Sequence, residues 1–274
     1  MDADGGSIEM DDHRRSSRQA IDEMLRDRII PRLVEGSFEI GFSKVKAGRE
    51  PELNTGLDTQ QIENLADNLV EGNEVEVGAL FESMFEQGHT VSDLFLELLS
   101  PTAVELGARW KQDLCSFADV TMGMSVLHTV LRNNSKRLAM ELASDVAGLS
   151  ILVTPMPGQT HVFGASVVEE FFRAANWDVH SGLNCSEDEL LTVLANEHFT
   201  LVGLSVAHNG LIESCKDFIS KIRNVSLNQE IGIMVGGPVF VLDPLQVEAV
   251  GADVTASDAR QALETARLMN GKIG

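Results

Sequence analysis

The sequence predicts a two-domain protein, in which an all-α four-helix bundle precedes an α/β domain of the Rossmann-like, flavodoxin-like class. Up to about residue 146, apolar residues recur at helical spacing; beyond it, short apolar runs alternate with amphipathic helices. A length of 274 residues allows two domains, each with its own core. We therefore expect an N-terminal extension and linker at 1–57, the bundle at 58–146 and the sheet domain at 147–274.

The first 57 residues have the composition of an extension. Residues 1–16 are rich in Asp and Gly and predict disorder. A helix is expected from Ser17 to about Pro31, and the Gly-rich, polar stretch at 35–57 is expected to be a linker or long loop. The N-terminus has no apolar segment, so we expect no signal peptide. Three widely separated cysteines indicate free thiols in a reducing cytoplasm.

The bundle is expected to contain four helices with short connections. Glycines at 72 and 88 mark the ends of the first two helices. Pro101 could kink the third helix. The fourth begins with a plausible capping box that runs from Ser116 to Asp119. The expected ranges are 58–72, 77–88, 92–110 and 116–144.

The sheet domain opens with a strand–loop–helix–strand unit. The apolar run at 151–153 fits a strand buried on both faces, and a Pro/Gly-rich loop then leads to His161. An amphipathic helix follows from Phe163, and the next strand lies around Val179. Such a crossover is right-handed and places its loop at the carboxyl end of the strand, where open parallel sheets bind ligands. Further helices are expected at 187–197, 211–224, 243–250 and 258–269, with strands at 201–206, at 231–235 and around 254.

The formal net charge of −21 limits the classes of partner. Up to residue 150 there are 27 acidic and 14 basic residues, and after it 15 and 7, so both halves are acidic. Because duplex-binding proteins concentrate Lys and Arg on one face, we expect no direct nucleic-acid binding. A basic protein partner is compatible with this charge. No stretch approaches the roughly 20 apolar residues of a membrane span.

Four short motifs together resemble a known module. They are Leu106-Gly107-Ala108-Arg109-Trp110 in the bundle, and His161-Val162-Phe163-Gly164, Gly203-Leu204-Ser205 and Gly236-Gly237 in the sheet domain. Their combination, over roughly residues 58–270, resembles the cobalamin-binding module of methionine synthase, corrinoid methyltransferase carriers and cobalamin-dependent light sensors. In that family a histidine replaces the benzimidazole tail on cobalt, and the tail threads into the sheet domain.

The resemblance implies a role for each motif. His161 would be the metal ligand, because an imidazole nitrogen binds cobalt well. Trp110 would cover the other face of the ring, and Ser205 would donate a hydrogen bond to the buried tail. The glycines would let the backbone approach the cofactor closely: Gly164, Gly236 and Gly237.

Two residues of the fourth helix are further candidates. Met124 and His128 lie four positions apart and could line the upper side of the ring. A partly exposed histidine beside a core methionine is the alternative. In the N-terminal extension, His13 could supply a sixth ligand to the metal, although a solvated histidine is the simpler interpretation.

The chain departs from the family pattern at two places. Gln159 stands where the family has an aspartate that orients the histidine, and an amide provides less charge than a carboxylate. Methyl-transfer chemistry is therefore disfavoured. Val120 and Thr121 stand where a Glu-His pair holds the upper ligand in methyltransferases and adenosylcobalamin light sensors. Hydroxo- or aquocobalamin, or another tetrapyrrole, thus becomes more plausible relative to adenosylcobalamin.

The chain resembles photosynthesis-gene regulators of the PpaA/AerR type in these departures, in its acidic charge and in its N-terminal extension. The resemblance implies an antirepressor without enzymatic activity, whose partner is a DNA-binding repressor of the CrtJ/PpsR type and whose signal is light. Two alternatives stay open: a haem-binding redox sensor that uses the same His161, and a corrinoid carrier subunit of a methyltransferase.

Overall fold

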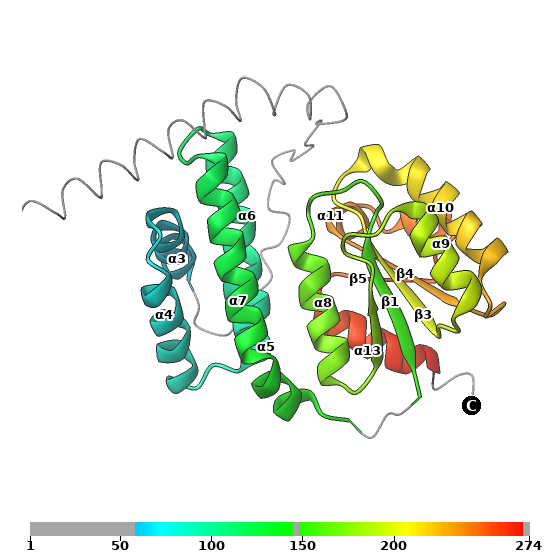
Figure 1. Ribbon diagram of the computed structural model, residues 1–274, viewed down its shortest axis with the longest axis horizontal. Helices are drawn as coiled ribbons and strands as arrows, with labels where there is room; N and C mark the ends of the chain where they lie inside the picture. The colour runs from blue at the N-terminus through cyan, green and yellow to red at the C-terminus, as the bar shows by residue number, and fades with distance from the viewer. Residues whose placement is uncertain (1–57, 145–147, 271–274) are drawn as a thin grey trace, which may run out of the picture.

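The computed structural model describes residues 58–144 and 148–270 (Figure 1). The segment 1–57, with its expected disorder, helix from Ser17 and linker, lies outside the described residues, as does His13. The three-part division of the chain therefore stays a prediction, whereas the helices and strands within the described part can be compared with it one by one.

The helical part is a four-helix bundle, as predicted. Asp58 caps the first helix in a capping box with Gln61, and Gly72 ends it with φ 78°. The predicted capping box of the fourth helix is present, since the Ser116 hydroxyl accepts from the Asp119 N–H and the Asp119 carboxylate accepts from the Ser116 N–H. The elements are α3 (Thr59–Glu71), α4 (Glu74–Glu86), α5 (Val91–Asp93), η2 (Leu94–Leu99), α6 (Ser100–Lys111) and α7 (Phe117–Leu142).

The third helix of the bundle continues through Pro101. Its segments α5, η2 and α6 follow one another without a break, and η2 is a turn of π-helix. Pro101 lies in the first turn of α6, directly after the π-helical turn. There the N–H of Ser100 reaches back to the carbonyl of Phe95. The π-helical turn shifts the hydrogen-bond pattern just before the proline, which has no N–H to donate.

The sheet has five parallel strands in the order β2-β1-β3-β4-β5, which is the flavodoxin-like order and confirms the predicted class. The strands are β1 (Ser150–Pro155), β2 (Asp178–Ser181), β3 (Leu201–Ser205), β4 (Gly232–Gly236) and β5 (Val254–Ala256). The longer helices are α8 (Phe163–Ala174), α9 (Glu187–Asn196), α10 (Ile212–Val225) and α13 (Ala259–Asn270), and η3 (Asn209–Leu211) is a short 3-10 turn before α10.

The helix predicted at 243–250 is present as α12 (Leu245–Ala249), and a short helix that was not predicted, α11 (Pro238–Leu242), precedes it. Asp243 leaves the helical conformation, with φ −138° and ψ 86°. Pro244 explains the break, because a proline disfavours the helical conformation of the residue before it.

The helices cover the sheet in two layers, with α8 and α13 on the face toward the bundle and α9 and α10 on the other (Figure 1). Helix α7 packs along α8, and one apolar core joins them: Leu127, Leu131, Phe163, Val167 and Phe171. Polar contacts also join the two parts. The hydroxyl of Ser135 donates to Glu170, and Arg260 donates to Asp93 at 2.6 Å. Within the described residues, no helix has the length and apolar character needed to cross a membrane.

Candidate functional site

A groove lies at the carboxyl end of the sheet, between the sheet, helices α8 and α13, and the bundle. Its volume is about 380 Å³. Residues of four neighbouring strands form its floor: Val153, Gly203, Met234 and Ala256. The third helix of the bundle contributes the opposite wall with Leu96, Ser100 and Val104. Ligands of open parallel sheets bind at this edge, so the groove lies where the topology predicts a site.

Small side chains keep the groove open. Helix α8 contributes Gly164 and Ala165, and α13 contributes Ala259 and Ala262. A Cβ added at Gly164 would meet no atom within 4 Å, so this position faces open space. A bulky group can therefore approach the backbone of α8 here without displacing protein atoms.

The predicted Ser205 and glycine pair lie together at the groove. Ser205 ends β3 and pairs with Gly236 at the end of β4, and the next N–H, that of Val206, donates to the Gly236 carbonyl at 2.9 Å. Gly237 has φ 113°, and an added Cβ there would collide with the carbonyl oxygen of Val206. Only glycine fits this turn without a clash. The turn holds the carboxyl ends of β3 and β4 in contact.

The loop between β1 and α8 is fixed to the end of β3. Pro157 and Gly158, the latter with φ 86°, form a tight turn closed by a hydrogen bond from the Gln159 N–H to the Met156 carbonyl, at 3.0 Å. The Gln159 amide nitrogen donates to the carbonyl of Ser205 at 2.9 Å, and its oxygen accepts from the Ala207 N–H at 3.0 Å. The described side-chain hydrogen bonds of Gln159 thus go to the backbone of β3 and of the loop that follows it.

His161 lies in this loop, just before α8, with an exposed side chain. Partial burial by the surrounding protein lowers the pKa of its imidazole, and the positive charges of Lys111 and His208 lower it further. A lowered pKa favours the neutral imidazole, the form that binds a metal. The effect of Lys111 also shows that the C-terminal end of α6, which carries Trp110, lies near the His161 loop.

Among the described residues, His161 is a single candidate metal ligand rather than part of a cluster of ligands. Over residues 58–144 and 148–270, no group of three or more His, Cys, Asp or Glu side chains could hold a bare metal ion. A corrin or haem itself supplies four nitrogen ligands to its metal, so one imidazole is enough as the protein's ligand. For such a group, His161 would supply the ligand, the open space at Gly164 would admit the ring and the adjoining groove would take a tail.

The bundle candidates lie apart from the groove. Trp110 is half-buried and packs edge-on against Phe117, with ring centroids 6.0 Å apart. His128 is half-buried between the bundle and α8, where its ring meets Phe163 at 5.1 Å. Burial lowers the pKa of His128, and Arg132 adds to the shift. Met124 packs against the bundle core, as the alternative interpretation expects.

The two departures of the bundle lie on the first turns of α7. Val120 is half-buried, and Thr121 is exposed with its hydroxyl donating to the Phe117 carbonyl at 2.8 Å. Neither side chain lines the groove. The two positions that correspond to the Glu-His pair of the similar light sensors thus carry a small apolar side chain and a hydroxyl that is already hydrogen-bonded.

Sequence reasoning missed two charged neighbours of His161 and the bundle wall of the groove. His208 follows the carboxyl end of β3 by three residues, so the topological rule for parallel sheets could have placed it near the site. Lys111 follows Trp110 directly but has no pattern of its own. Leu96, Ser100 and Val104 look like ordinary helix positions, and no local signal distinguishes them.

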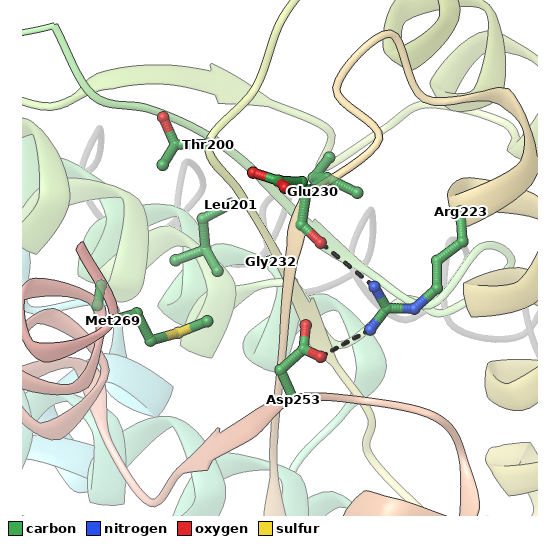
Figure 2. A pocket seen from close by; sticks show the side chains of 9 residues that line it. Thr200, Leu201, Arg223, Glu230, Gly232, Asp253 and Met269 are labelled. Carbon is green, nitrogen blue, oxygen red and sulfur yellow. Dashed lines mark hydrogen bonds and ion pairs between the residues drawn. The ribbon is translucent and has the colours of Figure 1, made fainter. Parts of the chain in front are cut away.

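A second hollow, of about 200 Å³, lies at the opposite edge of the sheet, near the amino ends of β3 and β4 (Figure 2). Arg223 is its cationic side chain. It donates to the Asp253 carboxylate at 2.9 Å and to the backbone carbonyl of Ile231 at 3.3 Å (Figure 2). It also donates to the backbone carbonyl of Gly251 at 3.0 Å. These bonds join α10 to the start of β4 and the segment before β5. The arrangement is that of a structural brace, so we do not place a ligand site there.

Comparison with known proteins agrees with this geometry. A B12-binding domain family matches residues 149–267, and a second B12-binding domain family matches residues 61–133. The chain is 21% identical over 175 residues to the "uncharacterized 20.5 kDa protein in bchF-crtJ intergenic region" of Rhodobacter capsulatus, with 64% of this chain and 91% of the relative covered.

Among solved structures, the fold is similar to that of the monomethylamine corrinoid protein of Methanosarcina barkeri. The TM-score is 0.61 at 20% identity, and the match covers 76% of this chain and 98% of that protein. This likeness concerns the fold. The two family matches confirm the cobalamin resemblance: residues 61–133 and 149–267 are B12-binding domains, and the chain belongs to the cobalamin-binding-domain proteins.

Proposed function

We propose that this protein is a cobalamin-dependent, light-responsive regulator that acts by binding a DNA-binding repressor of the CrtJ/PpsR type. The observation that supports it most is the groove. Gly164, Ser205, Gly236 and Gly237 line one cavity beside the His161 loop, in a chain with both B12-binding domains. Each of these residues would touch the cofactor, and none is needed for bond-making chemistry on a substrate.

In this proposal the residues of the chain bind and shield the cofactor and do not themselves react. His161 binds the metal as a neutral imidazole, which its lowered pKa favours. Ser205 donates a hydrogen bond to the tail in the groove. The C-terminal end of α6 with Trp110, which lies near the His161 loop, would exclude water from the cofactor. Bound cobalamin supplies a cobalt–ligand bond that light can change.

The regulatory part of the proposal rests on the resemblance and the charge. The named relative comes from the bchF-crtJ intergenic region, which is compatible with a partner of the CrtJ type. The net charge of −21 disfavours direct DNA binding and suits a partner with a basic surface. The signal would pass through the interface of α7 and α8, because α8 begins two residues after His161.

Two alternatives use the same site. A corrinoid carrier of a methyltransferase is compatible with the fold shared with the monomethylamine corrinoid protein, whereas Gln159 and Thr121 disfavour it. A haem-binding sensor is compatible with a single histidine ligand. Both would bind their cofactor through His161, so binding and light response must be measured separately.

The first test is the absorption spectrum of the protein mixed with hydroxocobalamin, adenosylcobalamin or haemin, in the dark and after illumination. We expect a stable one-to-one cobalamin complex that His161→Ala abolishes and His208→Ala retains. His208 is the matched control because it lies near His161 but on the neighbouring loop. Binding of haemin alone would replace the proposal with the haem sensor, and loss of binding in His208→Ala alone would reassign the ligand.

The second test concerns the partner. A purified CrtJ/PpsR-type repressor is mixed with the cobalamin-loaded protein in the dark and in light, and the complex is measured by size-exclusion chromatography. We expect binding to differ between the two conditions and to decrease with added salt, since the attraction is electrostatic in part. Equal binding with and without cofactor, in dark and light, would contradict the switch. Methyl transfer from the loaded protein to a thiol acceptor would favour the carrier instead.

A further inference from the structure

We propose that Gln159 is a positioning residue that clamps the His161 loop to the end of β3, and so sets the imidazole for metal binding. The clamp itself is a property of the protein alone. Its consequence for the cofactor rests on the proposed cobalamin binding, so the two are tested by different measurements below.

The geometry of the clamp is a two-point hydrogen bond. The Gln159 side-chain nitrogen donates to the Ser205 carbonyl at 2.9 Å, and the side-chain oxygen accepts from the Ala207 N–H at 3.0 Å. Both ends of one amide are therefore attached to one short stretch of backbone. Two simultaneous bonds fix the orientation of the amide plane as well as its position, which a single bond does not.

The backbone of the loop leads Gln159 to this place. The Met156 N–H also donates to the Ser205 carbonyl, at 2.9 Å, so β1 remains attached to β3 up to the start of the loop. The turn over Pro157 and Gly158 then reverses the chain, and Gln159 follows it directly. Gln159 is thus the attachment that comes after the turn, two residues before His161.

The clamp also joins the two histidine-bearing loops. Ala207, which Gln159 accepts from, is followed by His208, whose charge acts on His161. Ser205 lines the groove and pairs with Gly236 on β4. One amide therefore connects the His161 loop with the strand end from which the groove is built. A movement of the His161 loop would therefore be transmitted to the end of β3, and a movement of the end of β3 to the loop.

An amide is the side chain that this position requires. It offers a donor to the Ser205 carbonyl and an acceptor to the Ala207 N–H at the same time. A carboxylate could accept from Ala207, but its other oxygen would face the lone pairs of the Ser205 carbonyl. The glutamine that departs from the family's aspartate thus has a task that the aspartate could not perform in this arrangement.

The experiment uses the full chain with three variants. Gln159→Met keeps the length of the side chain and removes both hydrogen bonds, and Gln159→Glu keeps only the acceptor. Gln229→Met is the matched control: the Gln229 amide donates to the Ser226 carbonyl at 2.8 Å, in the loop before β4 at the far edge of the sheet. Unfolding by urea checks that each variant folds.

The clamp is measured by amide hydrogen exchange at Ala207 in the protein without cofactor. In Gln159→Met we expect exchange to accelerate by about fivefold, the effect of losing one ordinary hydrogen bond. In Gln159→Glu and Gln229→Met we expect no acceleration at Ala207. Unchanged exchange in Gln159→Met would overturn the clamp.

The positioning role is measured with hydroxocobalamin, through its affinity and the fraction of histidine-coordinated species in the absorption spectrum. We expect Gln159→Met and Gln159→Glu to lower both, and Gln229→Met to lower neither. If Ala207 exchange rises while affinity and spectrum stay as in the wild type, the clamp is structural only and the positioning role is overturned. If the wild type itself binds no cobalamin while the exchange result holds, the proposed function fails and the clamp remains.

Discussion

Two glycines at the groove are glycines for opposite reasons. At Gly164 an added Cβ would meet no protein atom within 4 Å, whereas at Gly237 it would collide with the Val206 carbonyl and would also suffer from the positive φ of 113°. The first glycine leaves space for something outside the protein. The second is a requirement of the fold. Substitutions at the two positions should therefore separate binding from stability.

We predict that Gly164→Leu lowers the affinity for hydroxocobalamin at least tenfold and leaves the free energy of unfolding within about 0.5 kcal/mol of the wild type. The leucine would occupy the open space beside α8, which the protein itself does not use. Titration followed by absorbance, together with urea unfolding of the cofactor-free protein, checks both parts. Undiminished affinity would show that the ring does not approach α8 here.

Gly237→Ala should destabilise the protein by about 2 kcal/mol or more, because it combines backbone strain with a steric clash. Gly88→Ala is the control, since Gly88 has a similar φ of 100° but open space around it. It should cost about 1 kcal/mol, the strain alone. Urea unfolding of the two variants measures the difference. Equal losses would mean that the clash is relieved by movement of Val206.

The buried thiol of Cys215 should resist alkylation in the folded protein. Burial raises its pKa to about 12, so at pH 8 the reactive thiolate is a fraction of roughly 10⁻⁴. Iodoacetamide treatment followed by peptide mass spectrometry should leave Cys215 unmodified until urea unfolds the chain. Because the pKa is raised, its labelling should increase as the pH rises. Prompt labelling at pH 8 would indicate local opening of α10.

At the scale of single residues, the sequence places some site residues and not others. His161, Ser205 and the glycine pair lie at or after the carboxyl ends of strands, and the positions of strand ends in a parallel sheet can be read from apolar runs. The bonds from Gln159 to Ser205 and Ala207 could not be foreseen, because they join loops 46 and 48 positions apart. Such contacts depend on side-chain direction in the folded chain, which residue order does not encode locally.

At the scale of elements, capping signals predicted helix starts well. The predicted box at Ser116 is formed, and Asp58, where the bundle was expected to begin, caps α3 in a second box that was not predicted. The limits of local signals appear at two prolines. Pro101 looks like a helix breaker but follows a π-helical turn that accommodates it, whereas Pro244 separates two short helices, α11 and α12. Whether a proline breaks a helix depends on the hydrogen-bond pattern before it, which tertiary packing decides.

The cap of α7 gives an element-scale prediction. Ser116→Ala removes the hydroxyl that accepts from the Asp119 N–H at 3.1 Å, so the free energy of unfolding should fall by about 1 kcal/mol. Ser125→Ala, at an exposed position inside the same helix, should be neutral or slightly stabilising because alanine has the higher helix propensity. Urea unfolding measures both. A neutral Ser116→Ala would show that α7 is held by its core packing alone.

At the scale of the whole molecule, the fold class was predictable, but the joining of the bundle to the sheet domain was not. The alternation of apolar runs and helices determines a doubly wound sheet. The contact between α7 and α8 uses apolar faces that would look the same if each domain were isolated. The polar links, such as Arg260 with Asp93, connect positions 167 residues apart. No pattern in the sequence pairs them.

The link between Arg260 and Asp93 provides the last prediction. Arg260 on α13 donates to Asp93 at 2.6 Å and to the Ser92 hydroxyl at 2.8 Å, and so attaches the sheet domain to the third helix of the bundle. Burial opposes ionisation of Asp93, but hydrogen bonds from Thr90 and Arg260 outweigh it and lower the pKa of the carboxyl. Asp93→Asn should therefore lower the free energy of unfolding at pH 7 by about 1 kcal/mol, since the Arg260 side chain is 42% exposed and partly screened.

The dependence on pH follows from the direction of the shift. A carboxyl whose pKa is lower in the folded state stabilises the protein above its unfolded pKa of about 3.9, and this contribution is lost as the pH falls through the folded value. The difference between wild type and Asp93→Asn should thus be present at pH 7 and should shrink below about pH 4. Asp67→Asn is the control, because its 2.6 Å ion pair with Arg109 lies within the bundle and Asp67 is 59% exposed. Urea unfolding at both pH values, read by circular dichroism, measures the differences, and a loss in Asp93→Asn that does not change with pH would mean that packing rather than charge joins the two domains at this point.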